Sequence, residues 1–299
     1  MWGDSRDREG TGELDPDLED AWRGVDAWID ELEPWLTAAD RAARMPRADF
    51  GADYTQGFEG WFGSVRVTRQ ICDPLSWAVR SLERRGANPE RGVRICETLL
   101  LWAPKIEPNL VLPYNVKNVV DEIACESLQR VARIPGFDIA AARQTLDPLL
   151  RLAEHDQARL DRALKTEIAY IVYACRLRTT WEGTHTLGEY AFFEDPPTIG
   201  LRMRMMFWRP QLWTSASRAL GLWQQGCEII KADQPGAYAE LKALAEENVI
   251  DAWLPGYMRV GIHQLLPGLQ RSRLRHRAQI RIARLGLAVL EHRKVHGIW

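Results

Sequence analysis

The chain has 299 residues, of which 46% are apolar and 27% charged. This balance is typical of a folded protein and excludes a largely disordered chain. The formal net charge of −2 gives the molecule as a whole no reason to bind nucleic acid. No stretch reaches the ~18 apolar residues that a membrane helix requires, and the polar residues 1–13 hold no signal-peptide core. We therefore expect a cytoplasmic chain as written, or an envelope or membrane-anchored protein if the native chain is longer.

The charges are unevenly distributed along the chain. Residues 1–50 contain 14 acidic and six basic side chains, whereas residues 259–299 contain nine basic side chains and one acidic one, Glu291. Such asymmetry is found on surfaces that bind nucleic acid or membranes. It is also found where two charged ends attract each other within a fold or a dimer, and we favour that second interpretation.

The five cysteines are widely spaced, lie in apolar stretches and form no CxxC pair or Cys/His cluster. Free cysteine in such a setting behaves as a small apolar residue. We therefore predict buried thiols in a reducing compartment and expect no cofactor bound through them. The residues are Cys72, Cys96, Cys125, Cys175 and Cys227.

The first predicted helix begins at Asp15 and Pro16, a capping residue followed by a proline suited to the first helical position. Residues 1–13 before it are predicted to be a disordered N-terminus. Apolar residues then recur at steps of three and four as far as Leu36, which is typical of an amphipathic helix. The next segment, 47–63, contains four glycines and is predicted to be an irregular loop.

The rest of the chain alternates helical periodicity with short turns rich in Gly, Asn and Pro. The segment RRGANPERG joins two helical patterns and predicts a helical hairpin. A second irregular segment is expected near 179–200, and a basic C-terminal helix over 270–299 follows a helical domain spanning 14–269. The remaining predicted helices span about 64–85, 91–102, 107–132, 138–154, 156–178, 208–231, 235–249 and 250–269.

No strong period-2 pattern appears, so the sequence predicts an all-α fold. Its helices are expected to form antiparallel pairs, stacked as an irregular tetratricopeptide-like array or as a multi-helix bundle. No clean 34-residue consensus recurs, so the sequence leaves these two arrangements open.

Three segments resemble a family of uncharacterised bacterial proteins common in planctomycetes and verrucomicrobia. They are ADFGADYTQG at 48–57, the paired-helix run at 85–128, and RAQIRIARLGLAVLEHRKVHGIW at 277–299. The resemblance is one of patterns over most of the chain and implies no catalytic residue. Members of that family often begin with a membrane helix and end in a pseudopilin-like tail, and this chain has neither. The resemblance implies a helical part of an envelope or secretion-associated protein.

The strongest candidate for chemistry is the segment containing Glu182, His185 and Glu189. An ExxH spacing places a carboxylate and an imidazole on one face of a helix, as in di-iron bundles. Such bundles need a second ExxH, which is absent here, and Gly183 and Gly188 favour a loop. One interpretation is a mononuclear metal or hydrolytic site in the 181–195 loop. The other is a polar loop with one exposed histidine.

Three further groups are interpreted as structural. His292 and His296 have a metal-ligand spacing but lack the glutamate of a zincin motif, so they are expected to interact with a helix C-terminus. The carboxylates of Asp121, Glu122 and Glu126 are interpreted as surface residues. The basic run is expected to form a solvated face or to pair with the acidic first helix, and contains Arg271, Arg273, Arg275, Arg277, Arg281 and Arg284.

No phosphate-binding loop, dinucleotide fingerprint or nucleophile elbow occurs in the sequence. The function that the sequence favours is therefore a non-enzymatic helical scaffold that binds a protein or peptide partner. The alternatives are a metal-dependent enzyme that uses the 181–195 loop, or an envelope-associated protein. The sequence does not predict the oligomeric state.

Overall fold

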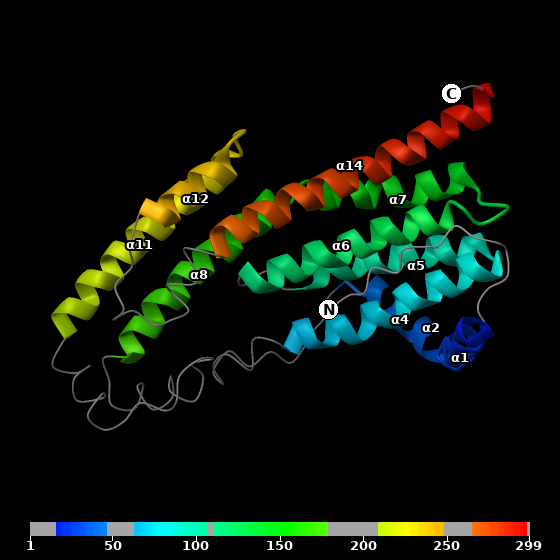
Figure 1. The fold of residues 1–299 in the computed structure, drawn as a ribbon, viewed down its shortest axis with the longest axis horizontal. Helices are drawn as coiled ribbons and strands as arrows, with labels where there is room; N and C mark the ends of the chain where they lie inside the picture. The colour runs from blue at the N-terminus through cyan, green and yellow to red at the C-terminus, as the bar shows by residue number, and fades with distance from the viewer. Residues whose placement is uncertain (1–15, 47–62, 107–110, 179–208, 248–264, 298–299) are drawn as a thin grey trace.

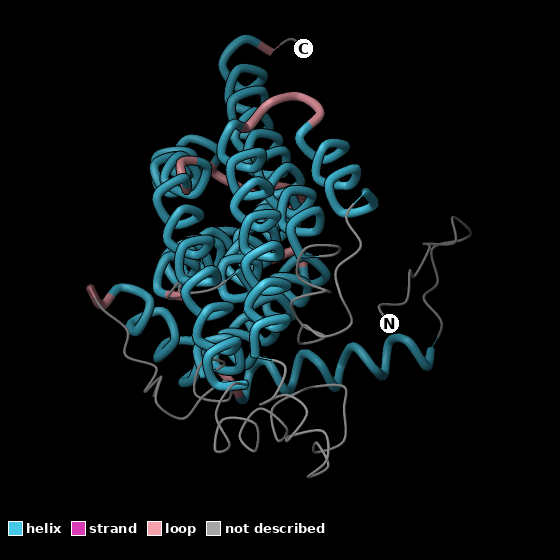
Figure 2. Tube along the Cα trace, turned by 90° about the vertical axis from the view of Figure 1, so that its left-hand side faces the viewer, coloured by secondary structure: helices cyan, strands magenta, loops and turns pink. Residues whose placement is uncertain are grey.

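A computed structural model of the protein describes residues 16–46, 63–106, 111–178, 209–247 and 265–297. Within these ranges every regular element is a helix, and the connections between successive helices are short turns (Figures 1 and 2). The prediction of an all-α fold is confirmed. No helix in the described ranges is long and apolar enough to span a bilayer.

The helix bounds agree with the predicted ones to within a few residues over most of the described chain. They are α1 Pro16–Glu31, α2 Glu33–Arg44, α4 Gly63–Arg85, α5 Pro89–Trp102, the 3-10 helix η2 Ala103–Lys105, α6 Val111–Val131, α7 Ile139–Glu154, α8 Gln157–Arg178, α11 Arg209–Ala232, α12 Ala237–Glu247 and α14 Leu266–His296. The predicted helix 250–269 lies mostly outside the described residues.

The N-terminal helix differs from its prediction, because it ends at Glu31 instead of continuing to Leu36. Pro34 has no backbone N–H to donate to the preceding turn, so a proline at this place interrupts a helix and is tolerated only in the first turn of the next one. Pro34 accordingly lies at the start of α2. The apolar spacing continues across the break, which is why periodicity alone missed it.

Helix α6 occupies the centre of the bundle and packs against α4, α5, α8 and α14. Helix α14 crosses the top of the molecule in Figure 1 and returns to α6 and α7, which precede it by more than a hundred residues. In a solenoid each repeat contacts only its neighbours. This long-range packing is typical of a multi-helix bundle, so of the two predicted arrangements the bundle fits these contacts better.

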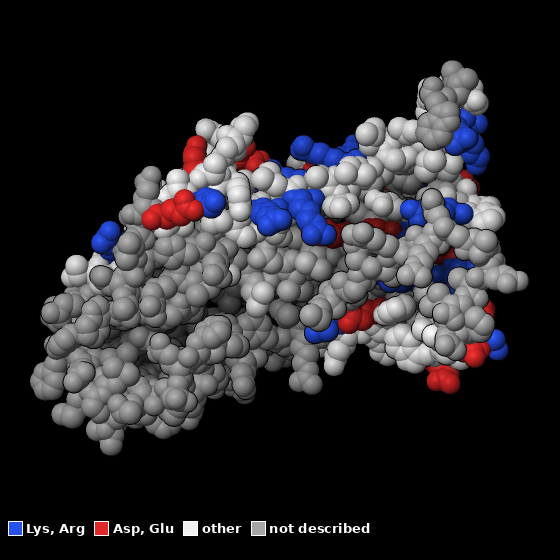
Figure 3. All heavy atoms as spheres, in the orientation of Figure 1, with Lys and Arg blue, Asp and Glu red and all other residues white. Residues whose placement is uncertain are grey.

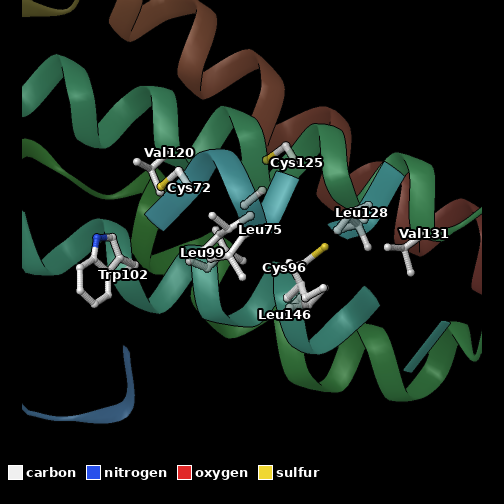
Figure 4. Close-up of a cluster of buried hydrophobic side chains, with 14 of the residues drawn as sticks. Cys72, Leu75, Cys96, Leu99, Trp102, Val120, Cys125, Leu128, Val131 and Leu146 are labelled. Atoms are coloured by element: carbon white, nitrogen blue, oxygen red, sulfur yellow. The ribbon is translucent and has the colours of Figure 1, made fainter. Parts of the chain in front are cut away.

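Two clusters of buried apolar side chains hold the helices together. The larger cluster joins α1, α2, α4, α5, α6, α7 and α14, and Figure 4 shows its centre around Leu75, Cys96, Leu99 and Leu146. The smaller one joins the start of α6, α8, α11, α12 and the start of α14, with Trp223 among its buried residues. Helix α14 contributes to both clusters, so it ties the two ends of the bundle together.

The burial predicted for the cysteines is confirmed for Cys72, Cys96, Cys125 and Cys227, which are all free and buried. Burial raises the pKa of Cys72 to about 12 and that of Cys227 to about 12. These thiols are therefore protonated and unreactive at neutral pH. The side chain of Cys175 lies outside the described residues.

Among the described residues, no ion pair joins the acidic N-terminal end of the chain to the basic C-terminal end. Asp26 and Asp30 of α1 pair with Arg84 and Arg85 of α4, and Glu33 of α2 pairs with an arginine of α5. The arginines of α14 pair with carboxylates of α6, α7 and the α11–α12 turn. Among the described residues of one chain, the first helix is therefore not the partner of the basic run, and pairing between two copies stays a prediction.

Candidate docking face on helix α14

The residues that the sequence singled out for metal chemistry, Glu182, His185 and Glu189, lie outside the described residues. His292 and His296 lie on the last turns of α14, where both are exposed and their ring centroids are 4.3 Å apart. No group of three His, Cys, Asp or Glu side chains suited to a metal occurs in the described part of the chain.

A cluster of charged side chains is buried beneath α14. We call it the buried charge cluster, and its members are Lys117 and Asp121 of α6, Asp156 at the start of α8, and Arg273 and His276 of α14. Lys117 Nζ lies 2.9 Å from Asp121 Oδ2 and 2.8 Å from Asp156 Oδ2. His276 Nε2 lies 2.9 Å from the same Asp121 oxygen. These pairs connect α6, α8 and α14.

Lys117 and Asp121 keep their charges because each is compensated by its neighbours. Burial on its own would raise the pKa of Asp121, but Lys117 and His276 hold that pKa below its ordinary value. Burial would likewise lower the pKa of Lys117, and the carboxylates of Asp121 and Asp156 raise it instead. Removing one partner of such a buried ion pair leaves an uncompensated charge and strongly destabilises the fold.

Arg273 connects α14 to α8 and α11. Its guanidinium donates hydrogen bonds of 2.7 Å to the carbonyl oxygen of Ile230 and 2.7 Å to Oε1 of Gln157. The same group lies 3.2 Å from Asp233, in the turn between α11 and α12, which also accepts a hydrogen bond from Arg277. One face of α14 is thereby fixed to α6, α8 and α11.

Two predictions about these residues are corrected by the structure. Asp121 is completely buried and Glu122 nearly so, although both were interpreted as surface carboxylates. Arg273 of the basic run is also buried, so a solvated face is wrong for this residue. Polar residues can occupy inward positions of a helix when oppositely charged groups meet them there, and the sequence of a single helix does not show those groups.

The His276–Asp121 contact resembles the base and its orienting carboxylate in hydrolases. Both side chains are excluded from solvent, with exposed fractions of 1% and 0%, so no substrate reaches them in this structure. The geometry therefore supports a role in holding α14 in place rather than in catalysis.

The outer face of α14 is apolar along its middle. Leu274, Ile282, Leu285 and Val289 expose between 40% and 64% of their surface, and the exposed Ala278 lies between the first two. Their spacing of 4, 4, 3 and 4 residues places them on one side of the helix. We call these five residues the α14 stripe. The stripe was not predicted, although its spacing is visible in the sequence.

A surface pocket of about 550 Å³ lies beside the start of the stripe. The wall on α14 consists of Leu274, Arg277, Ala278, Arg281 and Ile282, and the α11–α12 turn with Tyr238 forms the other. Asp233 belongs both to this pocket and to the ion pairs of Arg273. The pocket adjoins the stripe, because Leu274, Ala278 and Ile282 belong to both.

Lys and Arg side chains gather along α14 towards both of its ends, with uncharged atoms between them (Figure 3).

Comparison of the chain with known protein families, characterised proteins and solved structures gives no match. The resemblance to the bacterial family therefore remains a prediction from the sequence.

Proposed function

We propose that the protein is a non-enzymatic helical binding protein that holds an α-helix of a partner protein against the α14 stripe. The observation that carries this proposal is the exposure of four large apolar side chains in a row on one helix. Scattered apolar residues are normal on protein surfaces, whereas a contiguous row is typical of an interaction site.

The spacing of the stripe supports a helical partner. From Leu274 to Val289 the stripe covers 15 residue steps, or about 22 Å along the helix axis. Residues at alternating steps of three and four form the seam along which two helices interlock. A partner helix of about four turns matches this length and presents its own apolar side chains to the seam.

The pocket beside the stripe supports a partner that inserts a side chain. Interfaces gain most of their affinity from a few large side chains that fill pockets. The apolar side chains of Leu274, Ala278 and Ile282 in its wall suit a Leu, Phe or Trp side chain from the partner. The buried charge cluster fixes the opposite side of the same helix, so the docking face is already ordered before the partner binds.

The proposal is tested with a display library of helical peptides of about 22 residues, about the length of the stripe plus one turn at each end. Four apolar positions per peptide are drawn from Leu, Ile, Phe and Val, and the positions at both ends from Glu, Gln and Lys. We expect selection on the wild-type protein to enrich binders that lose at least tenfold in affinity for the Leu285→Glu variant, because a charge then enters the seam.

Leu152→Glu is the matched control. Leu152 is 57% exposed, close to the 64% of Leu285, and it lies on the side of α7 turned away from the residues that meet α14. Binders should retain their affinity for this variant. Failure to enrich any peptide, or equal loss of binding in both variants, would contradict the proposed docking face.

A further inference from the structure

The α14 stripe is bounded by basic residues on the same side of the helix. Residues seven apart lie on nearly the same face of a helix. Arg271 precedes Ala278 by seven residues, and Arg275 precedes Ile282 by seven. At the other end, His292 and His296 follow Leu285 and Val289 by seven, and Arg293 lies between them. All five of these side chains are exposed.

The basic side chains at the start of the stripe are available to a partner. Arg271 has no ion-pair partner among the residues that the structure describes. Arg275 contacts Glu122 at 3.0 Å but leaves 63% of its side chain exposed. By contrast, Arg273 on the opposite side of the helix is buried and fully engaged. At the start of the stripe, the outward side therefore carries the charge of Arg271, which is unpaired among the described residues, and the largely exposed side chain of Arg275.

These charges disfavour a second copy of the chain as the occupant. In a parallel pairing of two α14 helices each basic end would meet the same basic end. In an antiparallel pairing centred on the stripe, Arg271 and Arg275 would meet His292, Arg293 and His296. Both arrangements place like charges opposite each other, which destabilises an interface.

A membrane surface fits less well than a protein helix. Basic and apolar residues together also bind anionic bilayers. Here, however, the pocket wall formed by the α11–α12 turn rises beside Leu274 and Ile282, and Asp233 in that wall is negatively charged. A flat bilayer does not fill a recess of about 550 Å³, whereas a side chain from a helix does.

We infer that the partner helix is acidic at both ends of its apolar face, with Asp or Glu placed to meet Arg271 and Arg275 at one end of the α14 stripe and Arg293 at the other. This inference rests on the proposed function and specifies the partner's chemistry. Opposite charges at the edges of an apolar seam fix the register of two helices and speed their association.

The same peptide library tests the inference through the composition of its end positions. Peptides selected on the wild-type protein at low ionic strength should carry Glu at both ends more often than Lys, by at least tenfold. Their affinity should fall as salt is raised from about 0.05 to 0.5 M, because exposed charges are screened. Selection on the Arg271→Glu variant should replace Glu by Lys at one end only.

The outcomes separate the two proposals. Binders that depend on Leu285 but show no charge preference would overturn the acidic partner and leave the docking face standing. No binders at all would overturn the docking face. Self-association in sedimentation that disappears in Leu285→Glu would identify a second copy as the occupant and overturn the inference. Leu285-dependent binding to vesicles with 30% anionic lipid, roughly the level that attracts basic surfaces, together with no peptide binders, would overturn it in favour of a membrane.

Discussion

His276 Nε2 lies 2.9 Å from Asp121 Oδ2, and the same oxygen lies 2.9 Å from Lys117 Nζ, so one buried carboxylate contacts a histidine of α14 and a lysine of α6. This oxygen is a buried polar contact between the two helices, next to the more exposed ion pair of Arg275 with Glu122. The apolar contacts of Ile280, Ala283 and Leu287 continue the same interface towards the end of α14.

Removing the lysine should strongly destabilise the fold. Lys117→Met keeps the length of the side chain but leaves Asp121 and Asp156 buried without their cation. We expect the free energy of unfolding to fall by about 3–5 kcal/mol, measured by urea denaturation. The control is Lys242→Met, which removes an exposed pair with Glu246 and should cost less than about 1 kcal/mol. Similar costs for the two variants would show that the ion pairs of Lys117 do not stabilise the fold.

Glu167 should make stability depend on pH. This side chain of α8 is buried and accepts a 3.2 Å hydrogen bond from the backbone N–H of Val111, the first residue of α6. Burial raises its pKa to about 7, although the hydrogen bond from Val111 opposes the shift. The folded chain therefore holds a proton that the unfolded chain has lost, and the contribution of this group to stability falls as pH rises from about 4.5 to about 7.

Glu167→Gln keeps an oxygen for the N–H of Val111 and removes the charge. We expect the variant to be more stable than the wild type at pH 8, by up to about 3 kcal/mol, and nearly equal to it at pH 4.5. Urea denaturation at both pH values measures the difference. The same substitution at the exposed Glu240 should change stability by less than about 0.5 kcal/mol. If the stability gained in Glu167→Gln does not grow as pH rises, the carboxyl of Glu167 is not held protonated by burial.

At Gly92, helix α5 lies close against Val131 of α6. A Cβ atom at this position would lie 2.6 Å from Cγ2 of Val131, a branched side chain that is itself completely buried. Gly92→Ala should therefore lower the free energy of unfolding by about 1–3 kcal/mol. Gly221→Ala in α11, where no atom lies within 4 Å, should raise it by about 0.5–1 kcal/mol. Thermal denaturation of the two variants should show shifts of opposite sign.

Metal analysis separates the proposed function from the enzymatic alternative. If the protein is a binding protein, plasma mass spectrometry of the purified chain should find no stoichiometric transition metal. His185→Ala should then leave both the metal content and the binding of selected peptides unchanged. A bound metal that is lost in His185→Ala would instead favour the site containing Glu182, His185 and Glu189. Glu126→Ala, at an exposed carboxylate of α6, serves as the control.

The helices themselves could be predicted because the spacing of apolar residues depends only on local sequence. The segments 138–154 and 156–178 were placed within a residue of α7 and α8. The burial of Asp121 could not be predicted in the same way, since its partner His276 lies on a helix 155 residues away. A usable signal was present in Lys117 and Asp121, which are four residues apart between apolar neighbours.

The docking face escaped prediction for a related reason. Helix α14 carries apolar residues on two sides, with Ile280 and Leu287 on one and Ile282 and Leu285 on the other. The sequence shows both rows but does not show which of them the other helices cover. Only the packing of α14 against α6 and α7 decides that the second row faces outwards.

The separation of Asp121 and His276 along the chain also affects how the protein folds during its synthesis. Lys117 and Asp121 of α6 can pair with each other as soon as the helix forms, but Asp121 gains His276 only after 155 further residues have been synthesised. Contacts between distant segments form slowly, and incomplete chains expose surfaces that aggregate. A nascent chain halted before Arg273 would therefore leave the ion pairs of Lys117 and the apolar residues that meet Ile280 and Leu287 without their cover by α14, and exposed apolar surface of this kind is what chaperones recognise.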